Sequence, residues 1–214
     1  MKSMRILTIL VLALGLAVSS AWAAPNDVPA AAAPAKSAGA STVVKNFYGR
    51  LVDVMKQGDQ LGFDGRYKKL EPTIKSAFNL PLMTRFAVGL TWSTATPEDQ
   101  HRLISAFSNF SIATYANRFA AYDGERFDIV GEKPTSGGVI VETRLTPKDS
   151  EPVALNYLMK TDEAGNWRIV DVYLDGAISE LATRRAEFSS IVKRDGIPAL
   201  VNSLGEKSKQ LGTS

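Results

Sequence analysis

The chain has 214 residues, of which 45% are hydrophobic, 22% are charged and none is cysteine. A chain of this length can bury a hydrophobic core, and it does so here without disulfides. The 25 basic side chains outnumber the 22 acidic ones, but Lys2 and Arg5 lie in the first residues. The rest of the chain is close to neutral, so the basic balance does not predict nucleic-acid binding.

The first residues have the organisation of a secretory signal peptide. Lys2 and Arg5 form a positive segment, an almost unbroken apolar run follows over 6–18, and small residues surround Ala23. The apolar run is shorter than the about 20 residues that a membrane-spanning helix needs. We therefore predict a signal peptide over 1–23 and export of the chain, with a retained N-terminal anchor as the alternative.

Residues 24–40 are rich in alanine and proline, which predicts a flexible leader. No interdomain linker or internal repeat follows, so one domain is expected over 41–211. The first half of this domain has the periodicity of amphipathic helices. Helices are predicted over 43–55, 67–78, 82–92 and 97–122. The last of them begins at a strong start signal, Thr96-Pro97 followed by two acids.

The second half changes to the alternation that is typical of strands. Short connections favour antiparallel pairing of four strands, which begin at Phe127, Val139, Val153 and Trp167. Two helices, over 178–192 and 197–204, then close the chain. The fold class is therefore α+β, with a four-stranded antiparallel sheet flanked by N-terminal and C-terminal helices.

Both sets of alternating positions in these strands contain apolar residues, for example Leu155 beside Leu158 and Ile169 beside Val170. A sheet with one solvated side would show one polar face. The pattern therefore indicates either a sheet packed on both faces or a sheet curved around a cavity. Periodicity alone leaves both interpretations open.

The sequence offers few residues for catalysis or metal binding. His101 is the only histidine, and its charged neighbours predict a solvated position on a helix. No cluster of zinc ligands and no phosphate-binding glycine motif is present. Asp171 and Asp175 flank the end of the last strand and are predicted to be turn or helix caps, with an acid–base pair as the alternative. We predict no catalytic residue, metal or cofactor.

Several segments are similar, in order and spacing, to one known family. They are 63–67 (Phe-Asp-Gly-Arg-Tyr), 77–85, 113–116, 122–127, 152–157 and 167–176. Over about 43–211 the chain resembles the MlaC-type toluene-tolerance family, and most closely its hopanoid-biosynthesis-associated branch, HpnM.

The resemblance implies a periplasmic shuttle with an NTF2-like, curved sheet around an apolar pocket. It implies carriage of a hopanoid between an inner-membrane transporter, of the RND or ABC type, and the outer membrane. The shuttle would be a monomer that docks transiently on membrane complexes. The alternatives are a phospholipid carrier of the general MlaC type, an NTF2-like pocket enzyme that uses Asp171, and a lipid-free adaptor.

An apolar lipid needs a dry cavity lined by aromatic and branched aliphatic side chains. Helical phase and strand alternation predict the lining residues Phe86, Leu90, Phe107, Phe110, Tyr115, Phe119, Val141, Leu155, Tyr157, Ile169, Ile178 and Leu181. Segments 82–92 and 178–192 are expected to move when the pocket opens. Ordinary core packing is the alternative for the aromatic residues. Arg184, Arg185 and Arg194 are predicted to be solvated, with a partner-docking patch as the alternative.

Overall fold

The computed structural model describes residues 39–213. The signal peptide predicted over 1–23, and the leader predicted over 24–40 up to residue 38, lie outside the described residues. The elements are α1 (Ala40–Met55), α2 (Gly58–Ala77), α3 (Leu80–Val88), the 3₁₀ helix η1 (Gly89–Thr94), α4 (Pro97–Arg118), β1 (Arg126–Thr135), β2 (Gly138–Thr146), β3 (Val153–Thr161), β4 (Trp167–Leu174), β5 (Ile178–Ser179) and α5 (Glu180–Thr213).

The strands form one antiparallel sheet in the order β1-β2-β3-β4-β5. The predicted α+β class and the antiparallel meander are confirmed. The sheet has one strand more than predicted. The additional strand, β5, was not predicted because it is only two residues long. A strand of that length shows no alternation, and the sequence pattern therefore assigned Ile178 to the following helix.

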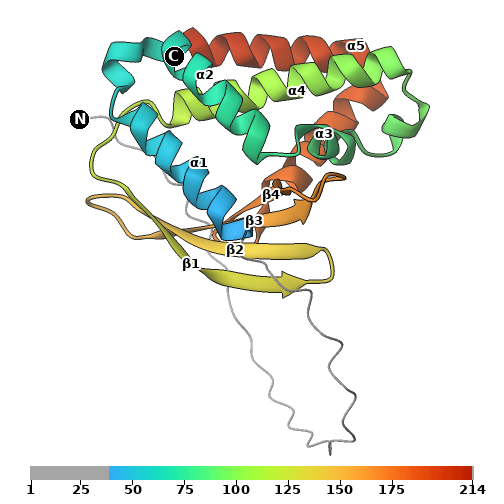
Figure 1. Cartoon of the computed structure of the whole chain (residues 1–214). Helices are drawn as coiled ribbons and strands as arrows, with labels where there is room; N and C mark the ends of the chain where they lie inside the picture. Colours follow the sequence, from blue (N-terminus) through green and yellow to red (C-terminus); the bar gives the residue numbers. More distant parts are fainter. Residues whose placement is uncertain (1–38, 214) are drawn as a thin grey trace, which may run out of the picture. The chain divides into compact units, whose positions relative to one another are not determined.

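Two bulges bend the sheet. On β1 the pairing register shifts between Ile129 and Gly131, so Val130 is an extra residue. On β4 the extra residue is Val170, which lies opposite the step from Leu158 to Met159 of β3. A bulge increases the local twist and bends the strand that carries it. The described helices lie on one side of this bent sheet, with α1 directly against it (Figure 1). We call the side that faces the helices the inner face.

The helices form a second layer above α1. In Figure 1, α4 and the C-terminal half of α5 run side by side at the top. The predicted division of the last helical region is confirmed, because Gly196 adopts φ 82° and ψ 174° inside α5. Gly62 breaks α2 in the same way, with φ 59° and ψ −175°. Both conformations are accessible almost only to glycine, so each fixes a bend in the helical layer.

The start of α4 agrees with the sequence-based prediction, whereas the end of α4 and the start of α2 differ from it. The hydroxyl of Thr96 accepts a hydrogen bond from the backbone N–H of Asp99 at 3.1 Å, as the predicted cap requires. At its other end α4 stops at Arg118, four residues earlier than predicted. Helix α2 begins at Gly58, well before the predicted start at Tyr67, because the Gly62 bend interrupts its hydrophobic period.

The start of α2 is pressed against the end of α4. A Cβ atom placed on Gly58 would lie 1.7 Å from the backbone oxygen of Ala120. Arg66, in the Phe-Asp-Gly-Arg-Tyr motif, joins the same two elements. Its guanidinium donates to the backbone oxygen of Ala116 at 2.8 Å and to that of Gly58 at 3.0 Å. The motif therefore has a structural role, which is to hold α2 on α4.

A second connection joins the chain's end to its middle. The Asn117 side-chain amide donates to the backbone oxygen of Leu211 at 2.8 Å, across 94 residues of sequence. The hydrogen bond places the last turns of α5 beside the end of α4. The helical layer therefore closes only when α5 is in place.

Candidate functional site

The inner face of the sheet is apolar along most of its length. Residues directly opposite each other on neighbouring strands point to the same side. The register places on this face Phe127 and Ile129 of β1, Val139, Val141, Thr143 and Leu145 of β2, Val153, Leu155, Tyr157 and Met159 of β3, and Ile169, Val172 and Leu174 of β4. The alternation predicted for β2 is confirmed, since Val139, Val141 and Thr143 are buried.

Burial on this face decreases from one end to the other. Val141, Tyr157, Met159 and Ile169 are fully buried. At the opposite end the inner-face residues are only half-buried, and together they define what we call the open end: Phe127, Leu145, Val153, Leu155, Val172 and Leu174. The side chains at this end of the inner face are therefore partly exposed to solvent.

A closed circuit of aromatic rings adjoins the open end. It links α1, β1 and the last turns of α4 through contacts at centroid distances of 4.7 to 6.1 Å. Its members, each touching the next, are Phe47, Tyr48, Phe127, Phe119 and Tyr115. Such distances are typical of favourable aromatic pairs. The circuit lines one side of the open end with flat, rigid apolar surface.

A short polar chain crosses this apolar region. The Tyr48 and Thr143 hydroxyls are hydrogen-bonded at 2.6 Å, and the Thr143 hydroxyl donates to the backbone oxygen of Leu155. The Thr143 backbone N–H donates to the Asn156 side-chain oxygen at 3.0 Å. The Tyr157 hydroxyl is also buried, and it interacts with the Tyr48 hydroxyl. The buried hydroxyls of this region therefore belong to one polar network.

Three tyrosines of this region are held in the neutral form. Burial raises the pKa of Tyr48 to about 12. Burial likewise raises the pKa of Tyr115 and of Tyr157 above the ordinary value, and the other tyrosines nearby add to the effect. A phenolate would be poorly solvated here. The phenols therefore act as neutral hydrogen-bonding groups.

These pKa shifts predict a loss of stability at alkaline pH. The folded state keeps protons that the unfolded chain releases near pH 10, so the stabilisation is complete below pH 10 and falls as pH rises towards 12. Each tyrosine contributes a slope of up to about 1.4 kcal/mol per pH unit. Denaturant unfolding at a series of pH values checks this, with tyrosinate absorbance as the second signal. An unfolding free energy that stays constant to pH 12 would contradict it.

The predicted lining residues occupy three different environments. Tyr115, Phe119 and Leu155 lie at or beside the open end, and Tyr157 and Val141 lie deeper on the same face. Ile178 is 55% exposed and pairs with Leu174, so it extends the open end at the edge of the sheet. Ile169 is fully buried at the other end of the inner face, where its backbone oxygen accepts from Asn79.

The remaining predicted residues lie on the helices. Phe107 contacts Phe188 at 6.1 Å, and the Arg184 guanidinium lies 5.0 Å from the Phe110 ring, both between α4 and α5. Leu181 is buried in the first turn of α5. Phe86 and Leu90 are 43% and 87% exposed on α3 and η1, so these two side chains face outward.

The sequence reasoning missed several members of the open end, namely Phe127, Leu145, Val153, Val172 and Leu174. Alternation already placed each of them on an apolar side of its strand. The missing information was the register between strands, which aligns these positions in space, and the end of the sheet that the helices leave partly uncovered. A pairing analysis of β2 with β3 would have grouped Leu145 with Val153.

The acidic residue considered for catalysis is fully engaged in capping. One Asp171 carboxylate oxygen accepts from the backbone N–H groups of Val172 and Leu181, at 2.7 and 3.1 Å. The other accepts from the Ser179 hydroxyl at 2.6 Å. Leu181 lies in the first turn of α5, so the predicted cap is confirmed.

Replacing Asp171 with alanine is therefore expected to lower the free energy of unfolding by about 3 kcal/mol, since one buried and two part-buried donors lose a charged acceptor. Denaturant unfolding measures the effect. Asp149, in the exposed loop before β3, is the matched control, and its alanine variant is expected to unfold like the parent chain. A loss as small for Asp171→Ala as for Asp149→Ala would show that the cap contributes nothing.

Other candidate sites are few among the described residues. His101 is exposed on α4, as predicted. Residues 39–213 contain no group of three or more His, Cys, Asp or Glu side chains that could hold a metal ion. No helix within the same range has the length and hydropathy to cross a membrane.

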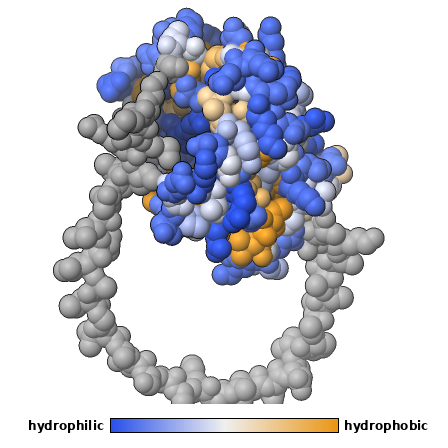
Figure 2. Space-filling view, turned by 90° about the vertical axis from the view of Figure 1, so that its left-hand side faces the viewer, coloured by the Kyte–Doolittle hydropathy of each residue, from blue (hydrophilic) through white to orange (hydrophobic). Residues whose placement is uncertain are grey.

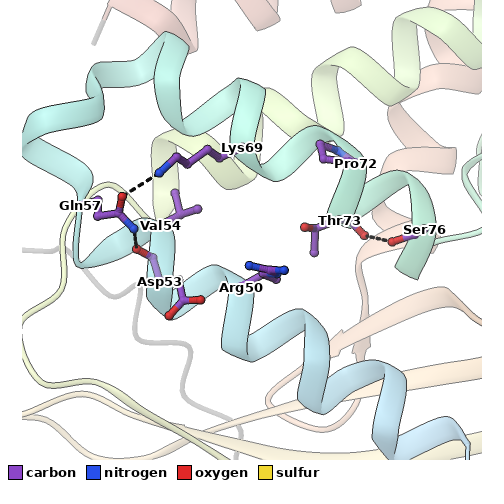
Figure 3. Close-up of a pocket in the computed structure, with 8 residues that line it drawn as sticks. All are labelled: Arg50, Asp53, Val54, Gln57, Lys69, Pro72, Thr73 and Ser76. Atoms are coloured by element: carbon purple, nitrogen blue, oxygen red, sulfur yellow. Dashed lines mark hydrogen bonds between the residues drawn. The ribbon is translucent and has the colours of Figure 1, made fainter.

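A separate groove lies between α1 and α2 (Figure 3). It has a volume of about 470 Å³ and is lined by Arg50, Asp53, Val54, Gln57, Lys69, Pro72, Thr73 and Ser76. Lys69 donates to the Gln57 side chain at 2.7 Å, and Gln57 donates to the backbone oxygen of Asp53 at 2.9 Å. These mostly polar walls suit a hydrated ligand better than an apolar one.

The face of the molecule in Figure 2 is mostly hydrophilic, with an apolar area near its lower edge. Large apolar side chains that are well exposed among the described residues are Phe86, Leu90, Tyr122, Val130 and Ile178. Single exposed apolar residues are common on soluble proteins. The half-buried open end is therefore the apolar feature that most needs an explanation.

The comparison with known proteins agrees with this fold. Residues 45–206 match the MlaC protein family. The chain belongs to the MlaC family. A solved structure with a similar fold is the phospholipid-binding protein from Ralstonia solanacearum, determined in complex with a phospholipid. It has a TM-score of 0.71 and 24% sequence identity, and the match covers 81% of this chain and 98% of that one. The predicted family is confirmed, and the HpnM branch of the MlaC family stays a prediction.

Proposed function

We propose that this protein is a periplasmic lipid carrier, which holds an apolar lipid against the inner face of its sheet and releases it at a membrane complex. The open end carries the proposal, because it is a half-buried, wholly apolar surface in a fold of the MlaC family. The phospholipid bound by the Ralstonia solanacearum protein supports a lipid as the ligand.

The energetics of such a site require no chemistry. Removing apolar surface from water contributes about 25 cal/mol per Å². A lipid that buries ~400 Å² of its surface is therefore held by roughly 10 kcal/mol before the losses of its own freedom. Such a carrier releases its cargo only if docking changes the pocket and thereby weakens the binding free energy of the lipid.

The residues proposed to bind the lipid are those at the open end and directly behind it. They are Tyr115, Phe119, Val141, Leu155, Tyr157 and Ile178, together with Phe127, Leu145, Val153, Val172 and Leu174. Phe107, Phe110, Ile169 and Leu181 support this surface as packed core, and Phe86 and Leu90 face outward on the segment expected to move. The aromatic circuit offers flat rings to either a polycyclic or an acyl cargo.

Two cargoes fit, and different observations favour them. The phospholipid complex of the similar structure favours a phospholipid. The motifs shared with the HpnM branch favour a hopanoid, whose rigid pentacycle matches the flat aromatic walls. In either case the lipid would pass between an inner-membrane transporter of the RND or ABC type and the outer membrane.

The elements proposed to move are α3 with η1 and the first half of α5, which pack against each other. The arginines near them differ in role. Arg184 is paired with Glu180 at 3.7 Å and with Glu187 at 3.5 Å, and Arg194 is paired with Asp195 at 2.7 Å. Arg185 is exposed beside Gly89. Arg185 is therefore the arginine of this group best placed to meet a docking partner.

Mass spectrometry of lipids extracted from the purified protein tests the proposal. Acyl phospholipids in stoichiometric amount would identify the general MlaC activity, and pentacyclic triterpenoids would identify the hopanoid branch. A protein that arrives empty and takes up neither class from vesicles would contradict carriage. The enzyme alternative is less well supported, because the Asp171 oxygens are occupied by structural hydrogen bonds.

A further inference from the structure

The short segment between α3 and α4 presents large apolar side chains to solvent. Leu90, the second residue of η1, is 87% exposed, and Phe86, in the last turn of α3, is 43% exposed. The chain turns between them at Gly89, whose φ of 72° and ψ of −138° are accessible almost only to glycine. In Figure 1 this segment lies at the right-hand end of the helical layer. We call residues 86–95 the η1 tip.

The backbone of the η1 tip is hydrogen-bonded from within the protein. Four of its backbone oxygens accept hydrogen bonds from side chains, namely those of Leu90, Thr91, Trp92 and Ala95. The Ser93 and Thr94 hydroxyls donate to the first two, at 2.8 and 3.0 Å. The Gln100 side-chain amide, from α4, donates to the other two, at 3.1 and 3.3 Å. Backbone groups enter an apolar medium at low cost only when they are bonded internally, and these four carbonyl groups meet that condition.

The charge at the η1 tip is positive. Residues 80–96 contain a single charged side chain, Arg85, and no acid. Arg185 of α5 reaches the same place, since its Nε atom lies 3.2 Å from the position of a Cβ atom on Gly89. Both arginines are exposed, and within the described part of the chain neither forms an ion pair.

The acids on the neighbouring elements compensate little of this charge. In the first half of α5, Glu180 and Glu187 are paired with Arg184, at 3.7 and 3.5 Å. At the start of α4, Asp99 is paired within its own helix at 3.8 Å, which leaves Glu98 as the exposed acid next to the tip. The tip therefore keeps a net positive charge, which complements an anionic surface.

We propose that the η1 tip docks the protein on an anionic phospholipid bilayer. Leu90 and Phe86 enter the boundary between headgroups and acyl chains, and Arg85 and Arg185 bind lipid phosphates. Exposed apolar side chains beside unpaired cations are the pattern of a protein that lies on a membrane surface without spanning it. Half-buried Trp92 is then at the level of the headgroups, where tryptophan is favoured.

This inference rests on the proposed carrier function and adds a lipid surface to its docking partners. The tip packs on α5, which begins directly after β5, and β5 pairs with Leu174 at the open end. Docking at the tip therefore acts on a helix that starts at the edge of the proposed lipid site.

Co-sedimentation with vesicles tests the docking. The protein is purified from the periplasm, so that the predicted signal peptide is absent, and is mixed with vesicles of phosphatidylcholine alone or of phosphatidylcholine with phosphatidylglycerol. The wild type is expected to bind the anionic vesicles, to stay in solution with the neutral ones, and to bind less as salt is raised. Leu90→Ser is expected to weaken binding by about 10-fold. Arg85→Gln and Arg185→Gln are expected to weaken it by about 5-fold each.

Two matched controls lie on the sheet. Val130→Ser removes an apolar side chain that is 57% exposed on β1, and Arg144→Gln removes an exposed cation from β2. Both controls are expected to bind like the wild type, and circular dichroism confirms that each variant is folded. Equal losses in Leu90→Ser and Val130→Ser would overturn the docking. So would a wild type that binds neither kind of vesicle, which would leave the tip to a protein partner.

The lipid extract of the same wild-type preparation keeps this inference separate from carriage. Protein that contains lipid but binds no vesicle would overturn the docking alone. Protein that binds anionic vesicles through the tip but neither contains nor takes up lipid would overturn carriage and leave the docking in place.

Discussion

Replacing Leu155 with aspartate is expected to abolish lipid co-purification while the protein stays folded. Leu155 is half-buried at the open end, directly opposite Leu174. A carboxylate at this position keeps its hydration shell and places a charge where the apolar body of a lipid would lie, which is strongly unfavourable. Because the position is partly solvated, the empty protein tolerates the charge. The measurement is the ratio of extracted lipid to protein, with circular dichroism as the check on folding.

Ile140→Asp is the matched control for this variant. Ile140 is also a half-buried aliphatic residue in the sheet, but it lies on the outer face and pairs with Lys133, which can compensate the new charge. The control is expected to retain its lipid. Equal lipid content in both variants would mean that the open end does not bind the cargo. Tyr115→Asp, at the aromatic circuit, is expected to lose lipid in the same way.

Replacing Gly58 with alanine is expected to destabilise the protein by about 3 kcal/mol or more. The added methyl group would lie 1.7 Å from the Ala120 backbone oxygen, and a backbone atom cannot rotate out of the way. The contact between α2 and α4 must therefore separate, and the Arg66 hydrogen bond to Gly58 is lost with it. Overpacking of a rigid contact has costs of this size. Denaturant unfolding monitored by tryptophan fluorescence gives the value.

The chain provides a control for this prediction within the preceding helix. Gly49 is an exposed residue of α1, and a Cβ atom there would have no neighbour within 4 Å. Gly49→Ala should raise the free energy of unfolding by about 0.5–1 kcal/mol, because alanine is the better helix former. If both alanine variants shift stability in the same direction, the close approach of α2 to α4 is not important for folding.

Much of the fold could be predicted because the sequence expresses it locally. The alternation of Val139, Val141 and Thr143 and the Thr96 cap both depend on residues that are neighbours in the chain. The break at Gly196 was likewise visible as a glycine between two hydrophobic periods. Local signals of this kind survive in the folded protein because tertiary packing reinforces them.

The missed features depend on contacts between distant residues. Strand β5 exists only because Leu174 and Ile178 pair across a turn. The early start of α2 depends on Arg66 and Gly58 meeting the end of α4. The open end is a property of the register and of where the helices stop, and neither is encoded in any single segment. Phe86 and Leu90 show the same limit, since helical phase marked them as apolar but could not show that they face outward.

The hydrogen bond between Asn117 and Leu211 has a consequence for how the chain folds. It joins residues 94 positions apart, and Tyr48 and Thr143 are joined across 95. A topology with many contacts at such separations folds slowly, because the chain must close long loops before it gains from them. The contact between α4 and α5 can form only after α5 has been synthesised, so the helical layer assembles late relative to the sheet.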